Sequence, residues 1–148
     1  MGDLPGYVVA ILGTLLAAML CVLLHYEGLC RMERRFRAGA NSAGRRQMLL
    51  AILGVLALHM VEIWIFGIAW WALLHFPEAG SITGTAHVQW HGALFLSALA
   101  FTSLGFDAWV PVGAIRILAG VEALTGLVLV AWSASFAFLQ MQRHWKQE

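Results

Sequence analysis

The chain has 148 residues, of which 61% are hydrophobic and 11% are charged, and its mean hydropathy is +0.78. A soluble domain carries about 25% charged residues, so the composition excludes an ordinary soluble protein. The formal net charge of +1 excludes a strongly basic face for nucleic acid, and Cys21 and Cys30 are too few for a disulfide framework. We therefore expect a membrane protein that contacts lipids and no nucleic acid.

Three apolar segments are long enough to cross a bilayer, which takes about 20 consecutive apolar residues in a helix. They run from Leu4 to about Leu24, from Met48 to about Leu74 and from Val112 to about Leu139. The N-terminus has no basic region before its apolar run, so we expect the first segment to be retained rather than cleaved as a signal peptide. The sequence therefore predicts three transmembrane helices.

A fourth apolar run, Gly92 to Leu104, is too short to cross the membrane and predicts a buried or re-entrant helix. We expect this helix over residues 87–101, with Thr83 or Thr85 as its cap. The next residues, 102–107, break the helix. Backbone that is not helical at membrane depth is tolerated only where protein buries it or where it lines a wet cavity, so this break indicates a pore.

The residues of this break have the chemistry of an ion filter. Two hydroxyl residues, Thr102 and Ser103, are followed by Leu104, Gly105 and Phe106. Backbone carbonyl oxygens in such a loop can replace the hydration shell of a cation, and glycine permits the dihedral angles that turn them inward. The C-terminal end of the preceding helix places a partial negative charge toward a cation.

Lysine and arginine are concentrated at two places, which predicts the orientation of the chain. Six arginines follow the first span and two basic residues lie in the tail: Arg31, Arg34, Arg35, Arg37, Arg45 and Arg46, then Arg143 and Lys146. Only Arg116 lies elsewhere. Because basic loops stay in the cytoplasm, we expect the N-terminus outside and the C-terminus inside the inner (plasma) membrane.

The stretch from Ala93 to Phe106, followed by Val110 and Pro111, resembles the pore helix and selectivity filter of the bacterial two-transmembrane potassium-channel family. The family pattern is similar to ALYFSFVTLTTLGYGDIVP and aligns here without a gap. The run that begins at Arg116 is similar to the start of the family's inner helix, where a run like RLLAxLEALxG is familiar. The resemblance covers residues 93–138, about a third of the chain.

The resemblance implies an all-α, potassium-channel-like homotetramer with three transmembrane helices, a re-entrant pore helix and a filter loop. The chain then divides into an extra N-terminal transmembrane helix (1–28), a cytoplasmic basic loop (29–47), a channel-like pore domain (48–140) and a short cytoplasmic tail (141–148). It implies passive transport of potassium, with sodium as a second candidate ion. It implies no enzymatic activity, no cofactor and no metal beyond permeant cations.

Carried over residue by residue, the filter of this chain is Thr102, Ser103, Leu104, Gly105 and Phe106. The chain departs from the family at two neighbouring positions. Asp107 stands where the second filter glycine belongs, and Ala108 stands where the family has its aspartate. Phe95 and Leu96 also replace the usual pore-helix tryptophan pair, so the familiar hydrogen bonds behind the filter cannot form there.

Asp107 has two interpretations. Four copies around a fourfold axis would form an acidic ring at the outer mouth, or the carboxylate caps the filter turn by binding nearby amides. Glu122 lies inside the third span, where a carboxylate must face the protein interior, and we expect it to hydrogen-bond the pore helix as a filter support. By resemblance Gly126 is a candidate gating hinge, and helix packing is the alternative.

His59 and Glu62 lie one helical turn apart in the second span. They form either a proton-sensitive pair or a structural hydrogen bond between helices. His87 and His91 are four residues apart, a zinc-like spacing, although exposure to water or headgroups is the simpler interpretation. His25 and His59 lie on different spans, and no pair at one depth is evident.

Two alternatives to a conducting potassium channel stay open. The first is a non-conducting or non-selective relative in which Asp107 distorts the filter. The second is a haem- or metal-binding membrane component of a redox enzyme, for which the histidines are the candidate ligands.

Overall fold

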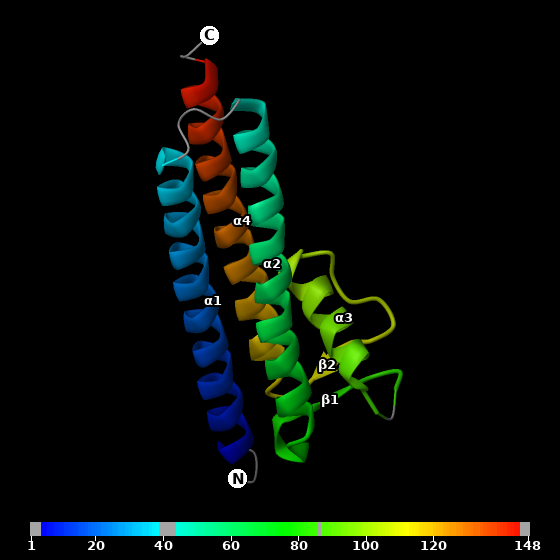
Figure 1. Cartoon of the computed structure of the whole chain (residues 1–148). Coiled ribbons are helices and arrows are strands. Elements are labelled where there is room, and N and C mark those ends of the chain that lie inside the picture. Colours follow the sequence, from blue (N-terminus) through cyan, green and yellow to red (C-terminus); the bar gives the residue numbers. More distant parts are fainter. Residues whose placement is uncertain (1–3, 39–43, 86, 146–148) are drawn as a thin grey trace.

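The computed structural model describes residues 4–38, 44–85 and 87–145, and these fold almost entirely into helices. The elements in order are α1 (Leu4–Ala38), α2 (Gly44–Leu74), the 3-10 helix η1 (Pro77–Ala79), β1 (Ser81–Ile82), α3 (Trp90–Phe101), β2 (Pro111–Val112) and α4 (Arg116–Trp145). Helices α1, α2 and α4 lie side by side, and α3 rests beside the half of α2 that ends at Leu74 (Figure 1).

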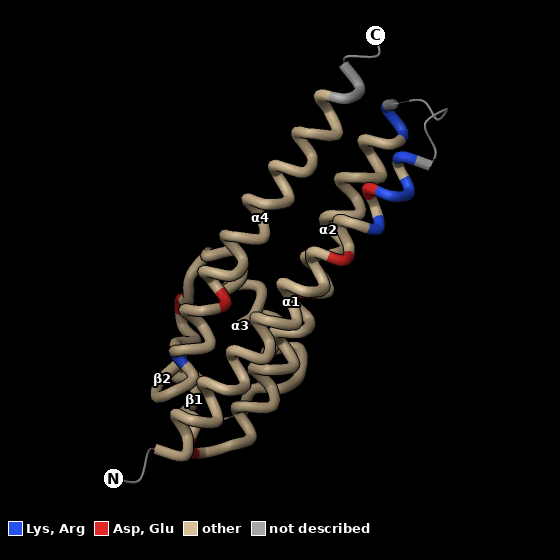
Figure 2. Tube along the Cα trace, turned by 90° about the vertical axis from the view of Figure 1, so that its left-hand side faces the viewer, with Lys and Arg blue, Asp and Glu red and all other residues tan. Residues whose placement is uncertain are grey.

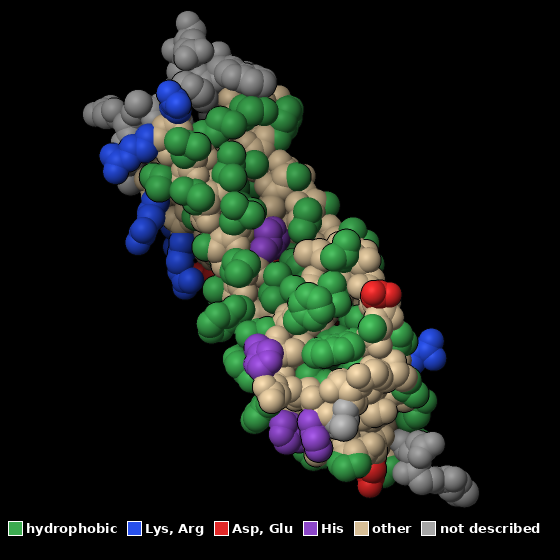
Figure 3. Space-filling view, turned by 90° about the vertical axis from the view of Figure 1, so that its right-hand side faces the viewer, with side chains coloured by type: hydrophobic (Ala, Val, Ile, Leu, Met, Phe, Trp, Pro, Cys, Tyr) green, Lys and Arg blue, Asp and Glu red, His purple; other side chains and the backbone are tan. Residues whose placement is uncertain are grey.

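The three long helices have the length and composition of membrane spans, as the sequence predicts. Apolar side chains cover much of the middle of the face shown in Figure 3, and the arginines gather at the end of the bundle where α1 ends and α2 begins (Figure 2). A soluble helix bundle would place its apolar side chains inside, whereas Leu12, Leu53 and Leu124 are each at least 60% exposed. The chain is therefore a multi-pass membrane protein.

Residues 29–47, predicted as a basic loop, are mostly helical. Helix α1 continues to Ala38 and α2 begins at Gly44, because arginine, methionine and glutamate are good helix formers. Two pairs four residues apart support the extension: Arg31 lies 3.4 Å from Glu27, and Arg37 lies 2.8 Å from Glu33. Helix α4 likewise extends to Trp145, into the predicted tail. Residues 39–43 and Lys146 lie outside the described residues.

The short strands join the chain before α3 to the chain after it. β1 pairs antiparallel with β2, with Ser81 opposite Val112. The amide of Thr83 donates to the carbonyl of Val110 (2.9 Å), and the amide of Ile115 donates to the carbonyl of Ala79 (2.8 Å). These bonds hold the chain before α3 against the chain before α4. The segment between them, which contains α3 and the following loop, is therefore anchored at both ends.

Helix α3 ends at Phe101, as predicted, but begins at Trp90 rather than near His87. Its N-cap is Gln89, which makes no side-chain capping bond. The predicted caps have other partners, since the Thr83 hydroxyl binds Val110 and the Thr85 hydroxyl donates to the carbonyl of His87.

The core lies where α1, α2, α3 and α4 meet. Its largest fully buried apolar side chains are Trp70, Phe66, Leu96, Ile115, Leu118 and Leu129. Helix α1 contributes a stripe of mostly small residues at spacings of three and four, namely Ala10, Thr14, Ala17, Cys21 and His25. Small residues allow helices to approach closely in a membrane, so this stripe docks α1 onto the other helices.

Candidate ion pathway and its supporting residues

The loop 102–110 leaves α3 through a tight helix-ending motif. The amide of Ser103 donates to the carbonyl of Ala100 (2.9 Å), and that of Leu104 donates to Leu99 (3.0 Å). This is the bond pattern of a Schellman motif, in which the residue in the position of Ser103 takes a left-handed conformation, usually as glycine. Ser103 has φ 55° and is the only non-glycine with positive φ among the described residues. Such strain costs on the order of 1 kcal/mol and often marks a functional loop.

The residues that match the filter pattern are turned away from their own chain. Thr102, Ser103, Leu104 and Gly105 are exposed, and the side chain of Leu104 is 78% exposed. Gly105 has φ 91°, and a Cβ placed there would meet no described residue within 4 Å apart from its chain neighbours. A hollow of about 510 Å³ lies between α3 and this loop, lined by Phe95, Leu99, Trp109 and residues 104–108. One protomer therefore leaves this face of the loop open.

Phe106 is the filter-pattern residue that turns inward. It is half-buried, and its ring packs edge-on against that of Trp70, with centroids 6.0 Å apart. Trp70 is fully buried, and its indole nitrogen donates a 2.6 Å hydrogen bond to Glu122. The loop is thus attached through Trp70 on α2 to a carboxylate on α4.

Glu122 also binds α3 directly. The Ser97 hydroxyl lies 2.5 Å from the second carboxylate oxygen and 2.8 Å from the carbonyl of Ile63 on α2. The hydrogen bond from Glu122 to the short helix, expected from the sequence, is present. Ser97 and Glu122 are fully buried. Because a buried carboxylate is stable only with hydrogen-bond partners, this network joins α2, α3 and α4 in one arrangement.

Trp70 and Ser97 are site residues that the sequence analysis did not predict. The spacing of four residues between Glu62, Phe66 and Trp70 places them on one face of α2, and all three are fully buried. That spacing is the signal for Trp70. A lone serine in the apolar run of α3 is the corresponding, weaker signal for Ser97.

Asp107 is exposed, and its carboxylate accepts no hydrogen bond from any residue that the structure describes. The interpretation of Asp107 as a turn cap therefore has no support in the geometry. Its φ is not positive, so the loop does not force Asp107 into the region that favours glycine. The left-handed positions of the loop are Ser103 and Gly105 instead.

Gly126 on α4 lies against the end of α3. A methyl group on Gly126 would overlap the carbonyl oxygen of Phe101, the last residue of α3. Close packing against α3 explains why residue 126 is a glycine. Its role as a gating hinge stays a prediction. At Gly120, which lies earlier on α4, a Cβ would meet no described residue within 4 Å outside its own stretch of helix.

Glu62 binds two histidines. Its carboxylate oxygens lie 2.7 Å from Nδ1 of His25 and 2.8 Å from Nδ1 of His59. The two imidazole rings stack with centroids 5.5 Å apart, so His25 and His59 do lie at one depth, contrary to expectation. The reason is the helical extension of α1 to Ala38, which places both histidines roughly four turns from the connection between α1 and α2. A proton-sensitive role for His59 and Glu62 stays a prediction.

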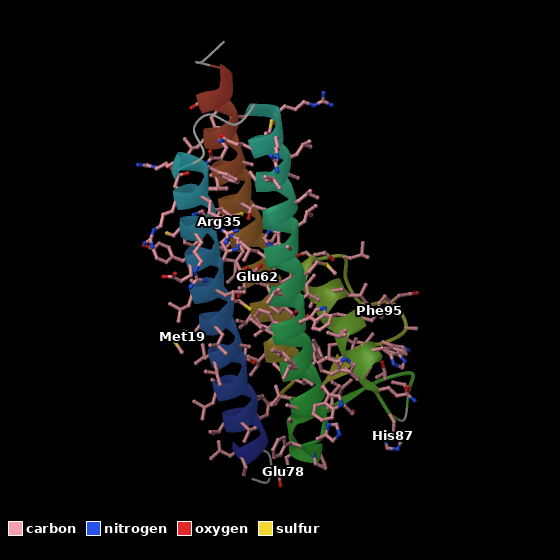
Figure 4. The ribbon with its side chains drawn as sticks, viewed as in Figure 1. Met19, Arg35, Glu62, Glu78, His87 and Phe95 are labelled. Atoms are coloured by element: carbon pink, nitrogen blue, oxygen red, sulfur yellow. The ribbon has the colours of Figure 1, made fainter. Side chains whose placement is uncertain are left out.

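His87 and His91 do not form the paired arrangement that their spacing suggests. His87 precedes the first residue of α3, and both side chains are exposed (Figure 4 labels His87). In the described part of the chain, the histidines that come together with a carboxylate are His25 and His59.

Comparison with known proteins identifies one family. The family model described as Ion channel matches residues 50–143, which contain most of α2, all of α3 and most of α4. Helix α1 lies outside this match. No protein of curated description and no solved structure matches the chain. A match over more than half of the chain shows that this protein belongs to the ion channel family, as the resemblance of residues 93–138 predicts.

Proposed function

We propose that this protein is a passive cation channel in which the backbone of residues 102–106 forms the selectivity filter. The observation that carries the proposal is the exposed loop at the C-terminal end of α3. Ser103 and Gly105 hold left-handed conformations there, and the chain leaves the loop uncovered. Membership of the ion channel family supports a transport role rather than an enzymatic one.

The proposed assembly is a homotetramer around the loop. One chain supplies one filter strand and cannot enclose an axis, so the pathway needs several copies. In this assembly α3 is the re-entrant pore helix, and its C-terminal end, directed toward the middle of the long helices in Figure 1, presents its partial negative charge to the ion. The open hollow beside Leu104 and Phe106 becomes a surface for a neighbouring copy.

The permeant ion in this proposal is potassium, with sodium as the competing ion. Carbonyl oxygens select for weakly hydrated monovalent cations. Asp107 contributes an acidic ring at the outer end of the filter, which raises the local concentration of cations and repels anions. Its exposure, and the absence of a hydrogen bond to it from the described residues, support this role over a structural one.

Glu122 is the proposed filter support, acting through Trp70 and Ser97. Trp70 contacts Phe106 on the loop, and Ser97 fixes α3, so the network stands behind the filter. It takes the place of the tryptophan pair that is missing at Phe95 and Leu96.

We place the arginine-rich end in the cytoplasm, which puts the N-terminus outside and the filter near the outer face of the plasma membrane. Arg116 at the start of α4 then lies at the outer side. Anionic lipid headgroups are the partners of the arginine-rich end in this arrangement.

Flux from reconstituted vesicles tests the proposal. Vesicles that contain the purified protein should release potassium down its gradient, with weaker release of sodium and none of chloride. The control is Gly105→Val, which removes the positive-φ glycine of the filter and should abolish flux while the particle keeps its size. If a folded tetramer passes no ion under any gradient, the protein is instead a non-conducting relative of potassium channels.

A further inference from the structure

A cluster of metal-ligating side chains lies between α1 and α2, apart from the proposed ion pathway. His25, His59 and Glu62 each offer one ligand atom, and these atoms lie within 4.8 Å of one another. Figure 4 shows Glu62 between the two helices. We propose that these three residues bind a divalent transition-metal ion of the zinc type inside the membrane-spanning bundle.

The ligand chemistry selects the class of ion. Two imidazole nitrogens and one carboxylate oxygen form a ligand set that zinc uses with a fourth position open. Magnesium and calcium take oxygen ligands, so they fit this set poorly. Bonds of about 2.1 Å place tetrahedral ligand atoms about 3.4 Å apart. The nitrogen-to-oxygen distances are 2.7 and 2.8 Å, each to a different oxygen of Glu62, so the side chains would move apart by about 0.6–0.7 Å as an ion replaces the bridging protons.

Neighbouring residues on α4 fix the orientation of the His25 ring. Nε2 of His25 lies 3.3 Å from the hydroxyl of Ser133 on α4, and Ser133 is buried. Histidines that bind metals usually make such a bond through the other ring nitrogen, which fixes the tautomer and orients the ring. The ring of Trp132 packs against His25 with centroids 5.4 Å apart. Three helices thus take part, two with ligands and α4 with the residues that orient them.

Among the three ligands, His59 is the one that is partly exposed, so an ion would enter from its side. The side chain of His59 is 14% exposed, whereas those of His25 and Glu62 are fully buried. The ring of His59 also packs against that of Phe101, with centroids 5.7 Å apart. The entry point is therefore adjacent to the residue at which α3 ends and the loop 102–110 begins.

Metal binding would join α1 to the part of the chain that matches the ion channel family. His25 lies outside the match, and His59 and Glu62 lie inside it. The ion would therefore fix α1 to α2 at His59, whose ring contacts Phe101 at the end of α3. Binding itself does not depend on conduction, so a failure of the proposed channel activity leaves this inference open to its own test.

The test uses the purified full chain in detergent, stripped with a chelator and titrated with cobalt(II). We expect one ion per chain, a visible d–d absorption typical of tetrahedral cobalt, and displacement by one equivalent of zinc. His25→Gln and Glu62→Gln should each weaken binding more than about 100-fold, and Ser133→Ala should weaken it about tenfold. His91→Gln is the matched control, since it removes an exposed histidine, and should change nothing.

A second variant separates ligand loss from misfolding. His25→Cys, made in a chain whose own cysteines are replaced by serine, should retain cobalt and add a thiolate-to-cobalt charge-transfer band. That band appears only if residue 25 contacts the ion. Absence of the cobalt spectrum in the folded protein would overturn the proposal, and so would unchanged affinity in His25→Gln and Glu62→Gln.

Discussion

The indole nitrogen of Trp70 on α2 donates a 2.6 Å hydrogen bond to the carboxylate of Glu122 on α4, and both side chains are fully buried. The Trp70 ring also packs against Phe106 in the loop after α3. A charge-bearing group at this depth is costly unless it is paired. Trp70 therefore links the hydrogen bond that stabilises the buried Glu122 to the position of the loop.

Trp70→Phe should destabilise the protein. It keeps an aromatic ring against Phe106 but removes the donor, which leaves one oxygen of a buried carboxylate with no partner from α2. We expect a loss of about 1–3 kcal/mol in the free energy of unfolding, measured by thermal or denaturant unfolding in detergent. Trp64→Phe on the same helix is the control, because Trp64 is 55% exposed and its replacement should change stability by less than about 0.5 kcal/mol.

Gly126→Ala and Gly120→Ala form a matched pair on α4. A methyl group at residue 126 overlaps the Phe101 carbonyl, so it should cost about 1–3 kcal/mol and displace the end of α3. The same change at residue 120 meets no atom within 4 Å and improves helix propensity, so stability should be unchanged or higher. Thermal unfolding of the two variants measures the difference. Equal stability would contradict the close contact.

Ser103→Gly should be more stable than Ser103→Ala. Both variants lack the hydroxyl, so the comparison isolates the backbone. Glycine takes the left-handed conformation without strain, whereas alanine does not, and we expect a difference of about 1 kcal/mol. Denaturant unfolding of the two proteins provides the measurement. If alanine were equally stable, residue 103 would not hold a φ of 55° in the native protein.

Asp107→Asn should reduce cation flux and leave stability unchanged. The carboxylate is exposed and makes no hydrogen bond to the described residues, so its loss removes charge and no contact. The effect should be largest at low ionic strength, because salt screens exposed charges. Single-channel conductance and reversal potentials in planar bilayers measure it. Glu78→Gln, an exposed acid in η1, is the control and should have no effect on conductance.

Local patterns predict a large part of this fold. The three spans follow from the length of the apolar segments, and the end of α3 at Phe101 follows from the residues after it. The gapless alignment of residues 93–111 with the potassium-channel pattern predicts the ion channel family. The match over residues 50–143 confirms that family. These features depend on neighbouring residues in the chain, so the sequence displays them directly.

Hydropathy does not predict the helix boundaries next to charged residues. Residues 29–38 are polar enough to indicate a loop, yet α1 continues through them to Ala38. Hydropathy reports where a helix leaves lipid and does not report where it ends. The propensities of arginine and glutamate, with the Glu33 to Arg37 pair, decide the length of α1 instead.

The order of residues along the chain is enough to predict the membrane spans, the end of the short helix and the need of Glu122 for a buried partner. The identity of that partner depends on how the helices pack. Trp70 is 52 positions away from Glu122 and His25 is 37 positions away from Glu62, so neither contact leaves a local pattern. In a membrane each buried carboxylate must find donors inside the bundle, and helix packing determines which donors are within reach.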